Sequence, residues 1–132
     1  MHLFPGALAR YNHGMSFLVS RYLALLFAIG LAIGETIISW GHWQFAPLFI
    51  IDYLTAAFLL YAFYKTRKGE HACSLLAAWA FSAGVFYMDL FVNLDPALPA
   101  LLRPTPVVMA LIVLVLVLSL VGFFTALVAG RR

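Results

Sequence analysis

The sequence predicts an all-α integral membrane protein with four transmembrane helices in an antiparallel bundle. The composition is 65% hydrophobic and only 10% charged, whereas about a quarter of the residues in soluble domains are charged. Four apolar runs are each long enough to cross a hydrocarbon core about 30 Å thick, which takes roughly 20 helical residues. Continuous runs indicate helices, because barrel strands alternate and are only about 10 residues long. At 132 residues, the chain is expected to form a single membrane domain, residues 1–132.

The predicted elements follow one another with short connections. Residues 1–20 are expected to form a cytoplasmic or interfacial N-terminal segment, because Pro5 and polar residues interrupt its apolar run. The predicted spans are about 22–40, 47–64, 72–92 and 107–129. Residues 93–106 form a proline-rich external loop, in which Asp95 and the proline after it are typical of the start of a short interfacial helix.

The basic residues sort by side of the membrane. Seven of the eight lysines and arginines flank the cytoplasmic ends of the predicted spans: Arg10, Arg21, Lys65, Arg67, Lys68, Arg131 and Arg132. Only Arg103 falls on the other side, so the positive-inside rule puts both termini in the cytoplasm. The net charge of +3 therefore reflects topology and does not indicate nucleic-acid binding. We expect a multi-pass protein of the cell membrane, of the bacterial inner-membrane kind.

Three carboxylates lie inside predicted spans, one on each of the first three helices. A helix rises about 1.5 Å per residue, so Glu35, five residues before Trp40, lies roughly 7 Å below the outer interface. Asp52 comes five residues into its span, and Asp89 comes four residues before Asn93, which gives both a similar depth. We therefore expect the three acids to converge at one level in the outer third of the membrane.

Three neighbouring carboxylates in a low dielectric cannot all stay ionised without compensation. Either one of them holds a proton, or positive charge neutralises them from a metal ion, protonated His42, Arg103 or a cationic substrate. A metal ion would use the oxygen ligands of Glu35, Asp52 and Asp89. The structural alternative is that acids close to the interface reach water or form a fixed ion pair. The candidate cation- or proton-binding residues are Glu35, Asp52, Asp89, His42, Tyr53 and Asn93, with Arg103 as a candidate charge partner.

Small residues on the first span predict close helix packing. Gly30 and Gly34 form a GxxxG pattern, and Ala28 and Ala32 belong to a second ridge of small residues. We favour packing within the chain over a dimer seam. Cys73 is the only cysteine, so no cysteine-pair metal motif exists. The sequence also predicts neither haem nor nucleotide as a cofactor, and the bound cation, if there is one, cannot be named from it.

Two classes of function fit these features best. The first is a small transporter, channel or binding protein whose acidic site binds or moves a proton, a metal ion or an organic cation. The second is an accessory or structural subunit of a larger membrane complex. A membrane enzyme acting on a lipid-like substrate, with an acid and Tyr53 or His42 as its acid–base pair, is less favoured. The expected partners are the lipid bilayer and either further copies of this chain or other membrane subunits.

Overall fold

Four long α-helices account for most of the molecule. The computed structural model describes residues 5–40, 46–68 and 72–131. The long helices are α1 (Pro5–Ser39), α2 (Ala46–Lys65), α3 (Ala72–Leu94) and α4 (Pro106–Gly130), with short 3-10 helices η1 (Thr66–Lys68) and η2 (Ala100–Leu102) between them. In the part of the chain that is described, every regular element is therefore helical, and the all-α prediction is confirmed to that extent.

The helices have the length and surface of membrane spans. Three of them are long and apolar enough to cross a bilayer: Gly6–Ile38 within α1, Ala72–Leu94 and Pro106–Gly130. Large apolar side chains cover the outside of the molecule, and Ile37 and Phe124, for example, are 71% and 58% exposed. Such a surface suits lipid better than water. The helix α2, 20 residues long, corresponds to the second predicted span, 47–64, and is not among these three.

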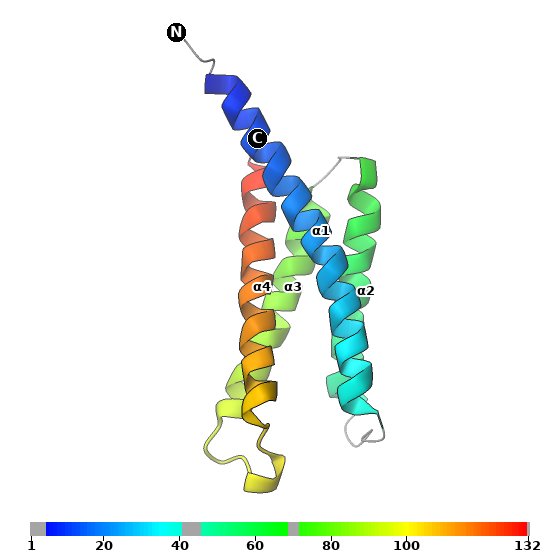
Figure 1. The fold of residues 1–132 in the computed structure, drawn as a ribbon, viewed down its shortest axis with the longest axis vertical. Helices are drawn as coiled ribbons and strands as arrows, with labels where there is room; N and C mark the ends of the chain where they lie inside the picture. Colours follow the sequence, from blue (N-terminus) through cyan, green and yellow to red (C-terminus); the bar gives the residue numbers. More distant parts are fainter. Residues whose placement is uncertain (1–4, 41–45, 69–71, 132) are drawn as a thin grey trace.

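The helix boundaries lie close to the predicted spans except at the start of α1. Residues 5–20 do not form a separate element, because α1 runs without a break from Pro5 to Ser39. Proline is well suited to the first position of a helix, and no other proline occurs before residue 47. A single glycine such as Gly14 costs a helix only about 1 kcal/mol and does not end it. As a result, α1 extends beyond the other helices at one end of the molecule (Figure 1).

The helices pack side by side, and the start of α1 and the end of α4 lie at the same end (Figure 1). The helix α1 contacts α2 on one side and α4 on the other, and α3 in turn contacts both α4 and α2. Each helix therefore has two main neighbours. Polar groups on α1, α2 and α3 can thus face one another inside the bundle.

The core centres on Trp79 of α3, which is fully buried. Its Nε1 donates a hydrogen bond to Ser20 Oγ at 3.0 Å, and Ser20 Oγ donates to the Gly122 carbonyl at 3.1 Å. These two bonds link α3 to α1 and α1 to α4. A Cβ added at Gly122 would overlap the indole ring, so only glycine lets α4 approach this closely. Phe27 meets the same ring edge-on, with ring centroids 5.3 Å apart.

Candidate cation- or proton-binding site

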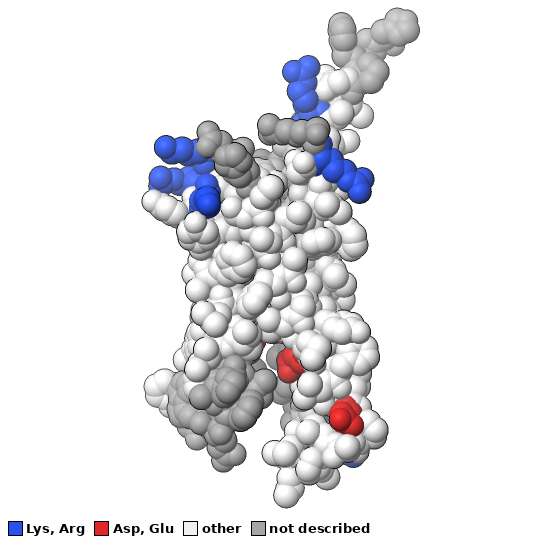
Figure 2. Space-filling view, turned by 180° about the vertical axis from the view of Figure 1, so that it is seen from behind, with Lys and Arg blue, Asp and Glu red and all other residues white. Residues whose placement is uncertain are grey.

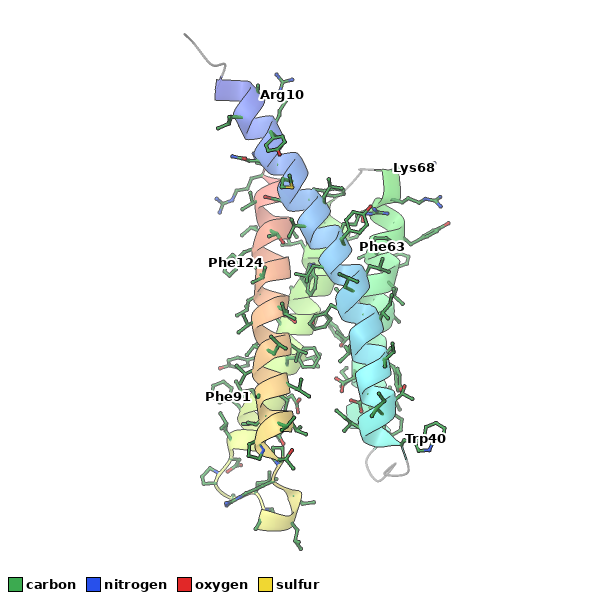
Figure 3. The ribbon with its side chains drawn as sticks, in the orientation of Figure 1. Arg10, Trp40, Phe63, Lys68, Phe91 and Phe124 are labelled. Carbon is green, nitrogen blue, oxygen red and sulfur yellow. The ribbon has the colours of Figure 1, made fainter. Side chains whose placement is uncertain are left out.

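Among the described residues, the Asp and Glu side chains gather at the end of the bundle opposite most of the Lys and Arg side chains. In Figure 2, most Lys and Arg atoms lie at one end, and the Asp and Glu atoms visible on this face lie toward the other end. Figure 3 labels Arg10 and Lys68 at the first end and Trp40 at the second. Glu35 lies five residues before Trp40 on α1, so it belongs to the second end.

Glu35 and Asp52 form the centre of the candidate site. Glu35 comes from α1 and Asp52 from α2, and both side chains are half-buried. Their carboxyl groups are close enough to share a hydrogen bond. An ionised carboxylate can only accept hydrogen bonds, so a bond between two carboxyl groups requires a proton on one of them. If both were ionised, a positive charge would have to lie beside the pair.

Asp89 brings a third acid toward this pair from α3. Its half-buried carboxylate interacts electrostatically with Glu35 and with Asp52. Asn93 lies one turn further along and donates from Nδ2 to Asp89 Oδ1 at 2.9 Å and to the Asp89 carbonyl at 2.8 Å. The amide thus fixes the rotamer of Asp89. Glu35 and Asp52 are in direct contact, whereas Asp89 acts on them through its charge.

Tyr53 is held by a residue that the sequence pattern did not single out. Its hydroxyl lies 2.6 Å from Thr36 Oγ1, so the bond joins α2 to α1. Thr36 Oγ1 also donates to the Ala32 carbonyl at 2.7 Å, which uses its one hydrogen. Tyr53 must therefore donate to Thr36. The signal in the sequence was a threonine directly after the intramembrane glutamate.

Of the two candidate positive charges, Arg103 and His42, the structure describes only Arg103. Arg103 lies in the connection after η2, where its Nε donates to the Leu98 carbonyl at 3.2 Å and its Nη2 to the Pro96 carbonyl at 3.4 Å. These bonds hold its guanidinium against its own loop. His42 lies outside the described residues.

A metal site is not formed by the acids as they stand. Within residues 5–40, 46–68 and 72–131, no group of three or more His, Cys, Asp or Glu side chains is close enough to hold a metal ion. The donor set that the structure offers is a carboxyl pair with a third acid further away. A carboxyl pair can hold a shared proton or accept hydrogen bonds from an organic cation.

The small residues of α1 divide between the core and the surface. Ala28 is fully buried, and Ala32 packs partly against the core. Gly30 is exposed and Gly34 is half-buried, and an added Cβ at either glycine would meet no atom within 4 Å. Alanine positions thus bring α1 close to its neighbours, while Gly30 leaves an open position on the outer surface of the helix.

Three comparisons with known proteins found no match to this chain. No protein-family model matches the chain, and neither a curated protein nor a solved structure matches it. The function must therefore be argued from the fold and the site alone.

Proposed function

We propose that this chain is a small multi-pass membrane protein that binds or moves a proton or an organic cation through an acidic site in the outer half of the bilayer. In this proposal the four helices form an antiparallel bundle, and both termini are cytoplasmic. The end that carries Arg10 and Lys68 faces the cytoplasm, because positively charged residues are retained on that side during insertion. The acids then lie toward the external side, and Trp40 marks the outer interface.

The observation that carries the proposal is the contact between Glu35 and Asp52. A charged side chain at the centre of a membrane helix costs about 2.5–3.5 kcal/mol on insertion scales, so intramembrane acids are rarely retained without a role. Here two acids from different helices meet, and Asp89 is a third acid that interacts with them. A site of this kind has a strong affinity for positive charge, because each bound proton or cation relieves the repulsion of the others.

The ligand is best described as a proton or a monovalent organic cation. Two carboxyl groups can pass a proton between them, and an organic cation can replace that proton. Because the proton and the cation compete for the same site, the flux of one is coupled to the flux of the other. Tyr53 and Thr36 support the pair by joining α1 and α2 one residue further along each helix. Asn93 limits the movement of Asp89. The residues around the pair therefore hold its two carboxyl groups in a fixed geometry, in which a proton or a cation can bind and be released.

An accessory subunit is the second candidate function, and α4 favours it. This helix carries no charged residue from Pro106 to Gly130. Large apolar side chains on its surface remain exposed, among them Val107 at 70% and Leu114 at 50%. A surface like this can be covered by lipid, by a second copy of the chain or by another membrane subunit. In that function, the acids would serve only to hold the bundle together.

Proton flux in proteoliposomes tests the proposal. We expect a potassium diffusion potential to drive proton entry, reported by trapped pyranine, and we expect Asp52→Asn or Glu35→Gln to reduce this flux to that of empty liposomes. An amide keeps the size of the side chain but cannot release a proton. Ethidium uptake under the same potential tests for an organic cation.

Asp95→Asn is the matched control. Asp95 lies at the same end but outside the helices, and its Oδ1 accepts from the Ala97 N–H at 2.9 Å, a bond that asparagine can keep. This variant should retain full flux. Unchanged proton and ethidium fluxes in the Glu35, Asp52 and Asp89 amide variants would contradict the proposal and favour the accessory subunit.

A further inference from the structure

Three aromatic side chains fill the centre of the bundle between its acidic end and its basic end. Phe27 of α1 meets Trp79 and Phe86 of α3 edge-on, with ring centroids 5.3 Å and 5.9 Å apart. All three side chains are buried, and Ala56 and Leu59 of α2 belong to the same buried cluster. The main neighbours of both α1 and α3 are α2 and α4, so α1 and α3 face each other across the bundle. Rings that meet between them therefore lie on the axis of the bundle.

The rings lie on the basic-end side of the acids. Both α1 and α3 run from the basic end toward the acidic end (Figure 1). With a rise of about 1.5 Å per residue, Phe86 lies roughly 5 Å from Asp89 along α3, and Phe27 lies roughly 12 Å from Glu35 along α1. A proton or a cation that travelled along the axis from the acidic pair to the basic end would have to pass these rings.

Apolar packing separates the acids from the next polar groups along the axis. Asp89, Phe86 and Ser82 share one face of α3 through steps of three and four residues. Phe86 thus lies between Asp89 and Ser82, whose hydroxyl oxygen is 2.7 Å from Ser119 Oγ. Among the described residues, every buried side-chain nitrogen and oxygen has a hydrogen-bond partner, so none of them requires a water molecule in this layer.

The three rings differ in how firmly they are held. Trp79 Nε1 donates to Ser20 Oγ at 3.0 Å, and the indole packs against Gly122. Phe27 and Phe86 carry no polar group, so packing alone holds them and a change of rotamer breaks no hydrogen bond. Trp79 is therefore the fixed side of this layer, and the two phenylalanines are the side chains that can move aside.

We propose that Phe27, Trp79 and Phe86 form an aromatic gate that is closed in this structure and separates the acidic pair from the basic end. This inference rests on the proposed function, in which Glu35 and Asp52 bind a proton or an organic cation. In the closed state the pair exchanges its ligand with the acidic end only. Movement of Phe27 or Phe86 opens the axis and lets the bound charge reach the basic end.

Proton flux in proteoliposomes measures the opening of the gate. Phe86→Ala should raise the flux reported by pyranine about tenfold over that of the native chain, because opening of the gate no longer limits movement along the axis. Unchanged flux would overturn the gate. Phe86→Ala combined with Asp52→Asn should lose the gain, and a gain that survived would show a route that bypasses the acids. Phe86→Leu keeps more apolar volume and should give a smaller rise, so it tests the gate even if the alanine variant does not fold.

Phe81→Ala is the matched control. Phe81 lies on the same helix and meets Phe58 of α2 edge-on at 5.9 Å, the same distance as between Phe27 and Phe86. It is 38% exposed, however, whereas Phe86 is 3% exposed. Loss of the Phe81 ring leaves the axis filled, so the flux should equal that of the native chain. An equal rise in both variants would contradict the gate, because general loosening of the bundle would then explain it.

Access of a thiol reagent tests the gate without any flux. Ser82→Cys, in a chain that also carries Cys73→Ser, puts a thiol directly behind the gate. The full-length protein in detergent is treated with aminoethyl methanethiosulfonate, and labelling is followed by mass spectrometry. Phe86→Ala should speed the labelling about tenfold, whereas Phe81→Ala should not. Equal labelling with and without the Phe86 ring would rule out the gate even if Asp52→Asn abolishes flux. Native flux in Asp52→Asn would instead overturn the proposed function, and the labelling would still decide whether the ring closes the axis.

Discussion

The layer around Trp79 and the acidic end both bring polar groups into an apolar bundle, but they differ in burial and charge. In the Trp79 layer the polar side chains Ser20, Ser82 and Ser119 are fully buried, and none of them can ionise. At the acidic end Glu35 and Asp52 are half-buried and ionisable, and we propose that they exchange a proton or a cation. The first region therefore has no group that can change its charge, whereas the second has such groups, and in the proposed function it changes its charge while the fold stays the same.

The energetics of the two regions explain this division. Interhelical hydrogen bonds between neutral groups in lipid contribute only about 0.6 kcal/mol on average, so the serines position the helices more than they stabilise them. Close packing of Trp79 on Gly122 supplies the stability instead. The acids carry a cost that a purely structural role would not require. Variants in the two regions should therefore have opposite patterns: loss of stability in one, and loss of function with little loss of stability in the other.

Gly122→Ala should produce the largest loss of stability. The added Cβ would overlap the indole ring of Trp79, which is fully buried and cannot move aside easily. We expect the free energy of unfolding to fall by about 1–3 kcal/mol, as in other overpacked cores. Unfolding by sodium dodecyl sulfate in mixed micelles, followed by circular dichroism, measures this change.

Gly84→Ala is the control for that substitution. A Cβ at Gly84, on the neighbouring helix α3, would meet no atom within 4 Å. Alanine has a better helix propensity than glycine by up to about 1 kcal/mol, so this variant should be as stable as the native chain or more stable. Equal effects of the two substitutions would show that Trp79 does not pack against α4 as described.

The helices could be predicted from the sequence far better than the contacts between them. Hydrophobic runs such as 72–92 are set by bilayer thickness, and α3 (Ala72–Leu94) ends within two residues of that run. The packing of Trp79 on Gly122 could not be found this way. The sequence of α4 is apolar all round, so no periodicity marks the face that meets α3. The start of α1 at Pro5 was missed because polar residues at a membrane surface interrupt hydropathy without interrupting a helix.

In the candidate site, too, the sequence predicts some features, while others depend on how the helices pack. The helical rise, counted from the expected ends of the spans, predicts a common depth for Glu35, Asp52 and Asp89. Which of the three meet depends on the rotation of each helix about its axis, and this is set by side-chain packing. Helix rotation decides both the Glu35–Asp52 contact and the bond between Tyr53 and Thr36. Sequence spacing could not separate the contacting pair from the more distant Asp89.

Tyr53→Phe should have a smaller effect on stability than Gly122→Ala and a larger effect on function. The substitution removes the donor to Thr36, which costs about 1 kcal/mol in stability. Proton or ethidium flux should fall by a larger factor than this loss explains, because the bond fixes α1 against α2 beside the acidic pair. Tyr61→Phe, at an exposed tyrosine of the same helix, should change neither quantity. A loss of stability with full flux would make Tyr53 a structural residue only.

The smallest effect should come from the pair Ser82 and Ser119, whose hydroxyl oxygens lie 2.7 Å apart between α3 and α4. Ser119 Oγ donates its one hydrogen to the Val115 carbonyl at 2.7 Å, so Ser82 must be the donor to Ser119. A double-mutant cycle with both alanine substitutions should give a coupling of about 0.6 kcal/mol. The coupling should be equal at acidic and neutral pH, because neither hydroxyl ionises in that range. A coupling energy that changed with pH would show that this layer responds to the ionisation of the acids. It would contradict the distinction between a core that does not titrate and a site that does.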